Sequence, residues 1–303
     1  MKHIFGPVTS RRYGLSLGVD LAVPKTCAFN CIFCQLGADA NTTVTRTALL
    51  PIAEILTELR KWLATGTPAD FITAAGSGEP TLHLHFAEIL RFARDEAHCR
   101  SLLLSNGALF TLPEIRRDAA IADVVKLSLH AWDQASFERI TRPHASLSFN
   151  AIIAGYRRFR QEFAGRIDLE VFIVPGINDT PEQVQRIAAI AASFNPDTIM
   201  LNTAVRPPAE SSVTRCPQDH LRLLARQFNP VAQVTGDEPS ASLPDLTPDA
   251  LTDLVSRHPA SLKFLAASFK RPEHELRALI NALADDRKLR VAEHQGELWA
   301  FPQ

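Results

Sequence analysis

Three cysteines lie close together in the segment Cys27–Cys34, which reads CAFNCIFC. Cysteine thiolates hold iron–sulfur clusters, and three of them in so short a loop can converge on one cluster. A four-iron cubane normally takes four cysteines, so three leave one iron open to a ligand from outside the protein. The spacing therefore predicts a [4Fe-4S] cluster with one open iron, held by Cys27, Cys31 and Cys34.

Two other interpretations of these cysteines remain open from the residues alone. A structural zinc site would need a fourth Cys or His in a C-x2-C pairing, and the nearest histidines, His3 and His83, belong to no such pairing. The cysteines could also be three unrelated buried thiols. We favour the cluster, because the spacing suits it better than either alternative.

The cysteine loop resembles the CxxxCxxC loop of the radical S-adenosylmethionine (SAM) enzymes. Other segments are similar to the branch of that superfamily related to the tRNA wyosine (4-demethylwyosine) synthases, namely Gly6–Gly14, Ser16–Asp20, Pro24–Cys27, Gln35–Gly37, Gly76–Leu82 and Val205–Pro208. The resemblance covers most of about the first 235 residues. It implies an open six-stranded partial barrel, written (β/α)6, and a cluster whose open iron is chelated by the amino and carboxylate groups of SAM.

The resemblance also implies a reaction. SAM is cleaved reductively to a 5′-deoxyadenosyl radical, which abstracts hydrogen from a substrate, and the electron comes from a flavodoxin- or ferredoxin-like donor. RNA (tRNA) and a peptide or protein are the favoured substrate classes, and no catalytic residue is expected beyond the cluster and SAM. The alternatives are an iron–sulfur-sensing winged-helix regulator and a glycyl-radical activating enzyme.

The elements that must position this site follow from hydrophobic periodicity. Apolar, β-rich runs predict strands at Leu17–Ala22, Phe71–Ala75, Ser101–Leu104, Val124–Leu129, Leu169–Val174 and Thr198–Leu201. Between them, helical spacing predicts helices at Ile52–Leu63, Phe86–Ala97, Ala151–Phe163 and Pro181–Ala192. Such alternation favours an α/β fold with a parallel sheet.

Polar and glycine-rich segments follow the ends of these strands, and in a parallel barrel all such ends share one rim. The resemblance implies that this rim binds SAM through Phe33, Ser77, Gly78, Glu79, Asn106, Lys126, Ser128, Asn178 and Asn202. Each residue also has a structural interpretation. Phe33 could only shield the cluster, Glu79 could cap a helix, Lys126 could be a barrel-interior charge, and Asn178 could form a turn.

Three arginines are candidates for binding an anionic substrate group. Arg206 stands in an Arg-Pro-Pro sequence, where the prolines could stiffen the backbone and aim the guanidinium into the cavity. Arg11 and Arg12 precede the cluster loop. An exposed arginine in a solvent loop is the competing interpretation. His130 is expected to be structural, and Cys216 a passive thiol.

Composition limits the class of protein. The 303 residues are 46% hydrophobic with a formal charge of −1, which suits a soluble globular protein. No apolar stretch reaches the roughly 18 residues of a membrane helix, and the first residues lack the apolar core of a secretory signal. We expect a cytoplasmic protein with reduced thiols and no membrane association.

A composition change near Gly236 predicts a second, smaller domain. We expect a barrel over 1–235, a linker over 236–245 and a winged-helix-like domain over 246–303, with helices at Pro248–Ser256, Ser261–Ala267 and Pro272–Ala284 and strands at Leu289–Ala292 and Leu298–Phe301. Residues 246–303 carry eight Lys and Arg against eight Asp and Glu. Because duplex binding normally needs a positive excess, we expect no specific DNA binding; docking of substrate or a structural cap fits better.

Overall fold

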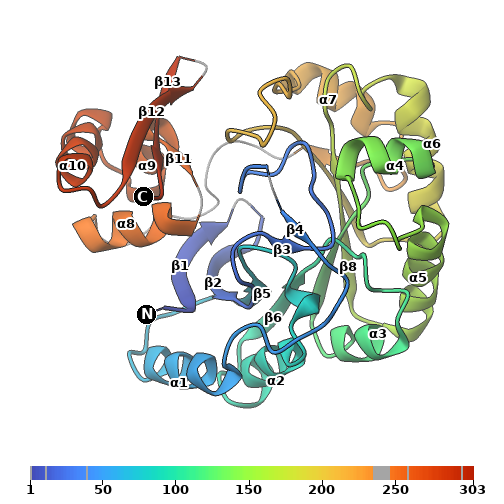
Figure 1. Cartoon of the computed structure of the whole chain (residues 1–303), viewed down its shortest axis with the longest axis horizontal. Helices are drawn as coiled ribbons and strands as arrows, with labels where there is room; N and C mark the ends of the chain where they lie inside the picture. The colour runs from blue at the N-terminus through green and yellow to red at the C-terminus, as the bar shows by residue number, and fades with distance from the viewer. Residues whose placement is uncertain (1, 11, 39, 235–245, 258, 295) are drawn as a thin grey trace.

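An eight-stranded sheet curls around the centre of the molecule (Figure 1). The computed structural model describes all residues except 1, 11, 39, 235–245, 258 and 295. In spatial order the strands are β1 (Ile4–Ser10), β2 (Gly14–Asp20), β5 (Phe71–Ala75), β6 (Arg100–Leu104), β7 (Val124–Ser128), β8 (Arg166–Phe172), β9 (Thr198–Asn202) and β10 (Gln233–Val234). β1 is antiparallel to β2, and the other neighbours are parallel.

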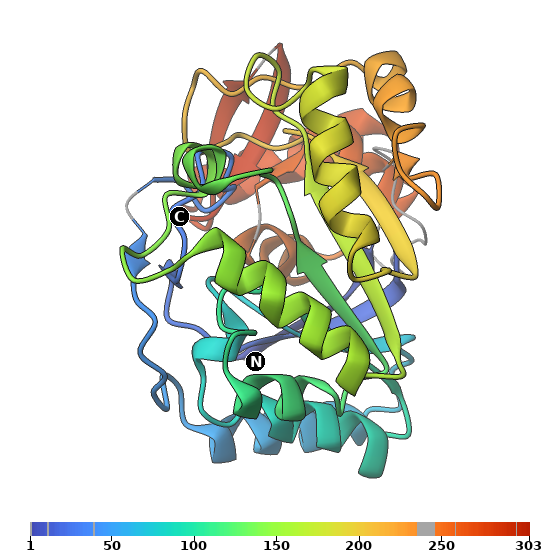
Figure 2. The same cartoon turned by 90° about the vertical axis from the view of Figure 1, so that its right-hand side faces the viewer.

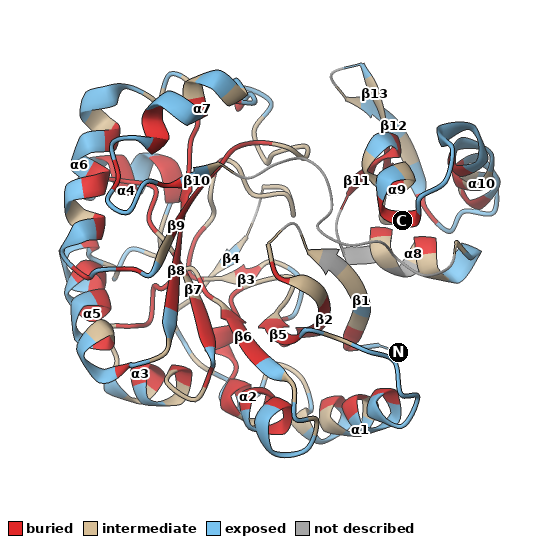
Figure 3. Ribbon diagram, turned by 180° about the vertical axis from the view of Figure 1, so that it is seen from behind, coloured by how far each residue is buried: buried red, intermediate tan, exposed pale blue. Residues whose placement is uncertain are grey.

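Helices cover the outer face of this sheet (Figures 1 and 2). They are α1 (Ile52–Leu63), α2 (Phe86–Asp95), α3 (Pro113–Ala119), α4 (Gln134–Thr141), α5 (Phe149–Glu162), α6 (Pro181–Ala192) and α7 (Gln218–Ala225). In α1 the buried residues Ile55, Leu59 and Trp62 recur at helical spacing, so one stripe of the helix faces inward. Figure 3 shows the same inward burial along the other helices.

The predicted α/β fold is confirmed. Each strand expected from an apolar run corresponds to one of β2 and β5–β9, although β2 starts and ends earlier than Leu17–Ala22. β1 and β10 were not predicted. β1 contains Gly6-Pro7, and proline normally argues against a strand because it cannot donate to the ladder. Here β1 is at the edge of the sheet, where that loss is tolerated.

The main hydrophobic core lies between the sheet and its helices and runs from Ile4 to Ala232. Tyr156 of α5 shows how this core fixes the loops above it. Its ring is buried, and its hydroxyl donates to the carbonyl oxygens of Asn106 (3.0 Å) and Ser128 (2.9 Å). Helix α5 therefore fixes the loop after β6 and the end of β7 relative to each other.

A second hydrophobic core lies among the described residues between Leu251 and Ala300 and includes Leu265, Leu276 and Ile280. The elements are α8 (Pro248–Arg257), β11 (Ala260–Ser261), α9 (Leu262–Phe269), α10 (Glu273–Asp285), β12 (Arg290–His294) and β13 (Glu297–Phe301). The strands form an antiparallel sheet in the order β11-β13-β12, and α8 contacts β1 (Figure 1).

The sequence also predicted a linker and no membrane helix. The predicted linker 236–245 lies outside the described residues. Within the described part of the chain, no helix has the length and apolar character needed to cross a bilayer.

Candidate active site

A cavity of about 450 Å³ lies inside the curled sheet and reaches the carboxyl ends of its parallel strands. It is lined by residues from most of the strand-end loops, among them Cys27, Cys34, Gly78, Asn106 and Asn202. The volume is within the range of roughly 300–1,000 Å³ that small-molecule sites have. The loops that the sequence predicted to share one rim therefore meet around one cavity.

Backbone hydrogen bonds hold the cysteine loop on both sides. The Asn30 amide donates to the Thr141 carbonyl (2.9 Å) and the Ile32 amide to the Ile140 carbonyl (3.1 Å), which ties the loop to α4. A short parallel pairing of β3 (Thr26–Cys27) with β4 (Asn41–Thr42) holds its start. The loop is thus fixed by its own backbone.

The three thiols affect one another electrostatically. Burial raises the pKa of Cys27 to about 12, and the Glu79 carboxylate adds to this. Burial also raises the pKa of Cys31, with further contributions from the Cys27 and Cys34 thiols, and raises that of Cys34. Buried thiolates need a cation, which a cluster iron would supply.

The described residues include no group of three His, Cys, Asp or Glu side chains that meets at a single-ion position. A cubane offers a different iron to each thiolate, so its ligands do not have to converge on one point. Cluster binding by these cysteines stays a prediction.

The glycine-rich turn after β5 is packed against the cysteine loop. A Cβ on Gly78 would lie 2.1 Å from the Thr26 carbonyl oxygen, and Gly76 has a φ of +139° and lies against Asp20. Asp20 accepts hydrogen bonds from the Ser77 amide (3.0 Å) and hydroxyl (2.7 Å). Gly76 and Gly78 line the cavity, whereas the Ser77 side chain holds the turn in place.

Glu79 lies on the cavity wall with a side chain that is almost fully buried. It caps the 3-10 helix Pro80–Leu82 through the Thr81 amide (3.1 Å), as the alternative interpretation expected. It also accepts from the Thr81 hydroxyl (2.6 Å), the Ser105 hydroxyl (2.7 Å) and the Asn106 amide (2.8 Å). Burial raises its pKa. Glu79 therefore joins the turns after β5 and β6 at the cavity wall.

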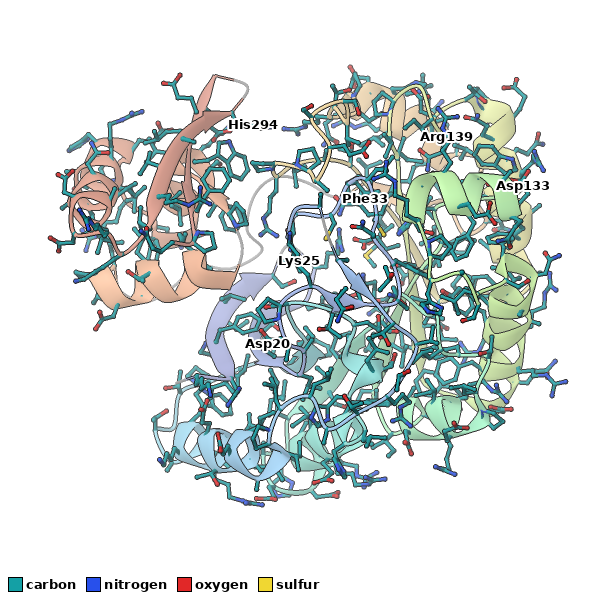
Figure 4. The ribbon with its side chains drawn as sticks, in the orientation of Figure 1. Asp20, Lys25, Phe33, Asp133, Arg139 and His294 are labelled. Carbon is teal, nitrogen blue, oxygen red and sulfur yellow. The ribbon has the colours of Figure 1, made fainter. Side chains whose placement is uncertain are left out.

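Asn106 and Ser128 line the cavity as predicted from their places after β6 and at the end of β7. The Asn106 amide group donates to the Cys27 sulfur (3.3 Å). Phe33, which is labelled in Figure 4, stacks on Phe172 with 4.0 Å between ring centroids and meets His130 edge-on at 4.9 Å. These rings form an apolar wall beside Cys34.

Asn178 is placed differently from the other predicted SAM contacts. Its side chain is fully buried, donates to the carbonyls of His130 (2.9 Å) and Phe172 (2.8 Å), and accepts from the Val174 amide (2.7 Å). It is not among the residues that line the cavity. All of its hydrogen-bonding groups are used by the backbone, so we leave Asn178 out of the site.

A buried ion-pair network lies on the cavity wall, and its central residue, Glu170 of β8, was not predicted. Glu170 accepts from Arg12 (2.7 Å), Lys126 (2.9 Å) and Asn202 (3.1 Å). The two cations, Lys126 foremost, hold its pKa well below the usual range despite its burial. Lys126 is a barrel-interior charge, as one interpretation had it. The sequence feature that could have indicated Glu170 as a site residue is its position as a carboxylate within an apolar strand.

Asn202 has one buried atom that the described protein does not satisfy. Its amide nitrogen donates to Glu170, whereas its Oδ1 is buried without a hydrogen-bond partner among the described residues. Buried polar atoms are normally hydrogen-bonded, so an unsatisfied acceptor on a cavity wall indicates a ligand with a donor group.

The three arginines predicted to bind the substrate differ in where the structure places them. Arg12 and Arg206 both line the cavity, whereas Arg11 lies outside the described residues. Arg206 donates to the Gln35 side chain (2.6 Å), directly after Cys34. Cys216 is buried, its amide donates to Thr203, and burial raises its pKa to about 11. It is not among the cavity-lining residues, which fits a passive thiol.

Comparison with known proteins identifies the class. A family model described as the radical SAM superfamily matches residues 22–191. A UPF0026 protein of Helicobacter pylori (strain J99) is 32% identical over 85% of this chain and 85% of its own length. The chain therefore belongs to the radical SAM superfamily and, within it, to the UPF0026 proteins. It is an enzyme of a class that uses a [4Fe-4S] cluster and SAM.

Two further relatives match this chain over only part of their own lengths. A protein of Brachyspira hyodysenteriae named GTPase Obg is 32% identical over 95% of this chain, but the chain spans only 43% of that protein. No glycine in this chain is followed by lysine, as a P-loop requires, so that name gives no reason to expect GTP binding. A probable dual-specificity RNA methyltransferase RlmN of Synechococcus elongatus is 26% identical, covering 78% of this chain and 60% of that protein.

Among solved structures, a radical SAM methyltransferase from Sphaerobacter thermophilus superposes with a TM-score of 0.52 at 19% identity. The superposition covers 73% of this chain and 65% of that chain. At this identity the likeness supports the fold alone.

Proposed function

We propose that Cys27, Cys31 and Cys34 hold a [4Fe-4S] cluster, and that the cavity binds SAM and uses it to abstract hydrogen from a substrate. When bound, the cofactors supply an electron for SAM cleavage and the resulting 5′-deoxyadenosyl radical. The observation that carries the proposal is the convergence of Cys27 and Cys34, the Gly76–Gly78 turn, Asn106 and Asn202 on one cavity.

Different residues of the cavity wall suit different parts of SAM. Phe33 and Phe172 exclude water from the side of the cavity next to Cys34. The close turn at Gly78 lets backbone groups approach the methionine part of SAM, with Glu79 beside it. Asn106, Ser128 and the free Oδ1 of Asn202 suit the hydroxyl and amino groups of a nucleoside. Lys126 and Arg12, which share the single carboxylate of Glu170, contribute positive charge on the cavity wall that suits the carboxylate of SAM.

Substitution of one cluster cysteine tests this proposal. After anaerobic reconstitution and reduction, we expect wild type to hold iron and sulfide and to form 5′-deoxyadenosine from SAM. Cys31→Ala should lose both the bound iron and sulfide and the formation of 5′-deoxyadenosine, because the two remaining thiolates no longer hold the cluster. Cys99→Ala is the matched control, since Cys99 contacts the Ala69 carbonyl away from the cysteine loop. Undiminished turnover in Cys31→Ala, or wild type that holds zinc without iron, would contradict the proposal.

We propose RNA as the substrate class, with tRNA the specific candidate of the wyosine-related branch. The RNA methyltransferase relative supports RNA. A peptide or protein is the alternative. We also propose a cytoplasmic location and a flavodoxin- or ferredoxin-like electron donor. Mass spectrometry of nucleosides from cells that lack the protein tests the substrate: one modified nucleoside should disappear, and an unchanged profile would count against RNA.

We further propose two domains, 1–235 and 246–303, the second a winged helix. The element order α8-β11-α9-α10-β12-β13 and the sheet order β11-β13-β12 support this assignment. The balanced charge of residues 246–303 argues against specific DNA as its partner. A role at the substrate side of the barrel fits better.

A further inference from the structure

The cavity is not built from the barrel alone. Phe264, a half-buried residue in the first turn of α9, lines it together with the strand-end loops. The Ser261 hydroxyl accepts from the Phe264 amide (3.2 Å) and caps the helix, so the start of α9 has a defined conformation. The unit 246–303 therefore contributes a side chain to the candidate active site.

Phe264 is next to the arginine that follows β9. The guanidinium carbon of Arg206 lies 6.0 Å from the Phe264 ring centroid, at the outer limit of a cation–π contact. Arg206 also donates to Gln35, which adjoins Cys34. An aromatic face and a guanidinium thus stand together on the part of the cavity wall that leads to the cysteine loop.

The size of the cavity restricts what enters beside SAM. About 450 Å³ is toward the lower end of the range for sites that hold one small molecule. A cavity of this volume is too small to admit a folded macromolecule. Only a single protruding group can reach the cavity, as when an enzyme extrudes one base from its substrate.

We propose that Phe264 and Arg206 form the wall that receives one nucleotide of the substrate. Phe264 stacks on the base, and Arg206 pairs with its phosphate. Proteins recognise unpaired RNA bases by stacking them on aromatic side chains, and arginine pairs with phosphate through a planar fork. This assignment rests on the proposed function and deepens it, because it makes residues 246–303 part of the substrate site.

The test uses the full-length protein with SAM and a labelled, mixed-sequence, single-stranded RNA of ten nucleotides. Stacking of one base is worth about 1–3 kcal/mol, so Phe264→Ala should weaken RNA binding roughly five- to 150-fold in fluorescence anisotropy. Phe264→Leu, which keeps an apolar side chain on α9, should weaken it similarly, and Phe264→Trp should preserve it. Ultraviolet cross-linking of 4-thiouridine RNA should label peptides that contain Phe264 or Arg206.

Phe301→Ala is the matched control. Phe301 also has an arginine beside it, with the Arg290 guanidinium carbon 5.8 Å from its ring, but it is not among the cavity-lining residues. This variant should change RNA binding less than twofold. SAM binding, measured by equilibrium dialysis, should be the same in all variants, which separates this proposal from the binding of SAM itself.

Three results would overturn the assignment. The first is an equal effect of Phe264→Ala and Phe301→Ala on RNA binding. The second is cross-linking confined to other peptides, which would leave the proposed RNA substrate in place, whereas no RNA binding at all would also overturn that substrate. The third is a phosphotyrosine peptide that binds more tightly than RNA with the same dependence on Phe264, which would make the substrate a protein.

Discussion

Glu170 is a carboxylate in the interior of the barrel, where a charged side chain needs partners. Its side chain is 13% exposed and is held between Arg12 and Lys126, with Asn202 as a third donor. A buried carboxylate between two cations is stable only while both charges are compensated. Glu170 therefore fixes the positions of three side chains on the cavity wall.

Glu170→Gln should lower the free energy of unfolding by about 3–5 kcal/mol, because it leaves two buried cations without their anion. Urea unfolding measures this. Glu96→Gln, which breaks the exposed pair with Arg60, is the control and should hardly change stability. Equal effects of the two substitutions would show that the barrel network contributes no more than a surface pair.

The same network predicts a pH dependence. The pKa of Glu170 is well below its unfolded value, with Lys126, Arg12 and His130 as the facing groups. Its contribution to stability is therefore present above pH ~4.5 and is lost as the pH falls through the lower folded pKa. The acid branch of the wild-type stability curve should be steeper than that of Glu170→Gln.

For single residues, the sequence predicted which strand ends carry polar side chains, but it did not predict the hydrogen bonds that those side chains make. Asn106 and Asn202 line the cavity as expected from their places at the ends of strands. Asn178 also follows a strand, but its amide is used by three backbone groups, two of its own segment (Phe172 and Val174) and the His130 carbonyl after β7. Local hydrogen bonding of this kind depends on a loop conformation that spacing does not specify.

Among the elements, the turn after β5 is closely packed against its neighbours. Gly78 lies against the backbone of Thr26, directly before Cys27, so the glycine turn and the start of the cysteine loop can meet only without a side chain. Asp20, at the end of β2, holds the turn from the other side. The two motifs, far apart in the sequence, form one packed unit.

Gly78→Ala should displace the start of the cysteine loop, because its Cβ would lie 2.1 Å from the Thr26 carbonyl oxygen. We expect a clear loss of iron after reconstitution, measured by metal analysis. Gly176→Ala is the control: Gly176 has a φ of +74° with nothing within 4 Å of its Cβ, so it should lose some stability and keep its iron. Full iron content in Gly78→Ala would contradict this account.

Elements with a long apolar pattern were predicted well, and short or edge elements were not. Ile52–Leu63 and Pro181–Ala192 match α1 and α6 to the residue. The helices α3, α4 and α7 were missed, since each is only seven or eight residues long and gives little periodicity. β11 has two residues, and its pairing with β13 depends on contacts distant in sequence.

For the whole molecule, the separation of the two hydrophobic cores has a direct consequence. The larger core contains residues from Ile4 to Ala232, and the smaller one residues from Leu251 to Ala300. A fragment of residues 1–245 therefore retains every member of the larger core. It should unfold cooperatively on heating, as followed by circular dichroism; a broad transition without a baseline would show that the barrel needs residues 246–303 to fold.

Among the described residues, β1 and β10 are the two outermost strands of the sheet, and no ladder between them closes the barrel. A strand at such a margin exposes backbone donors and acceptors that can template association with another molecule. In the intact chain α8 lies against β1 (Figure 1). The same unit that brings Phe264 to the cavity therefore shields the seam of the barrel, and the shortened protein should be colloidally less stable than the full one.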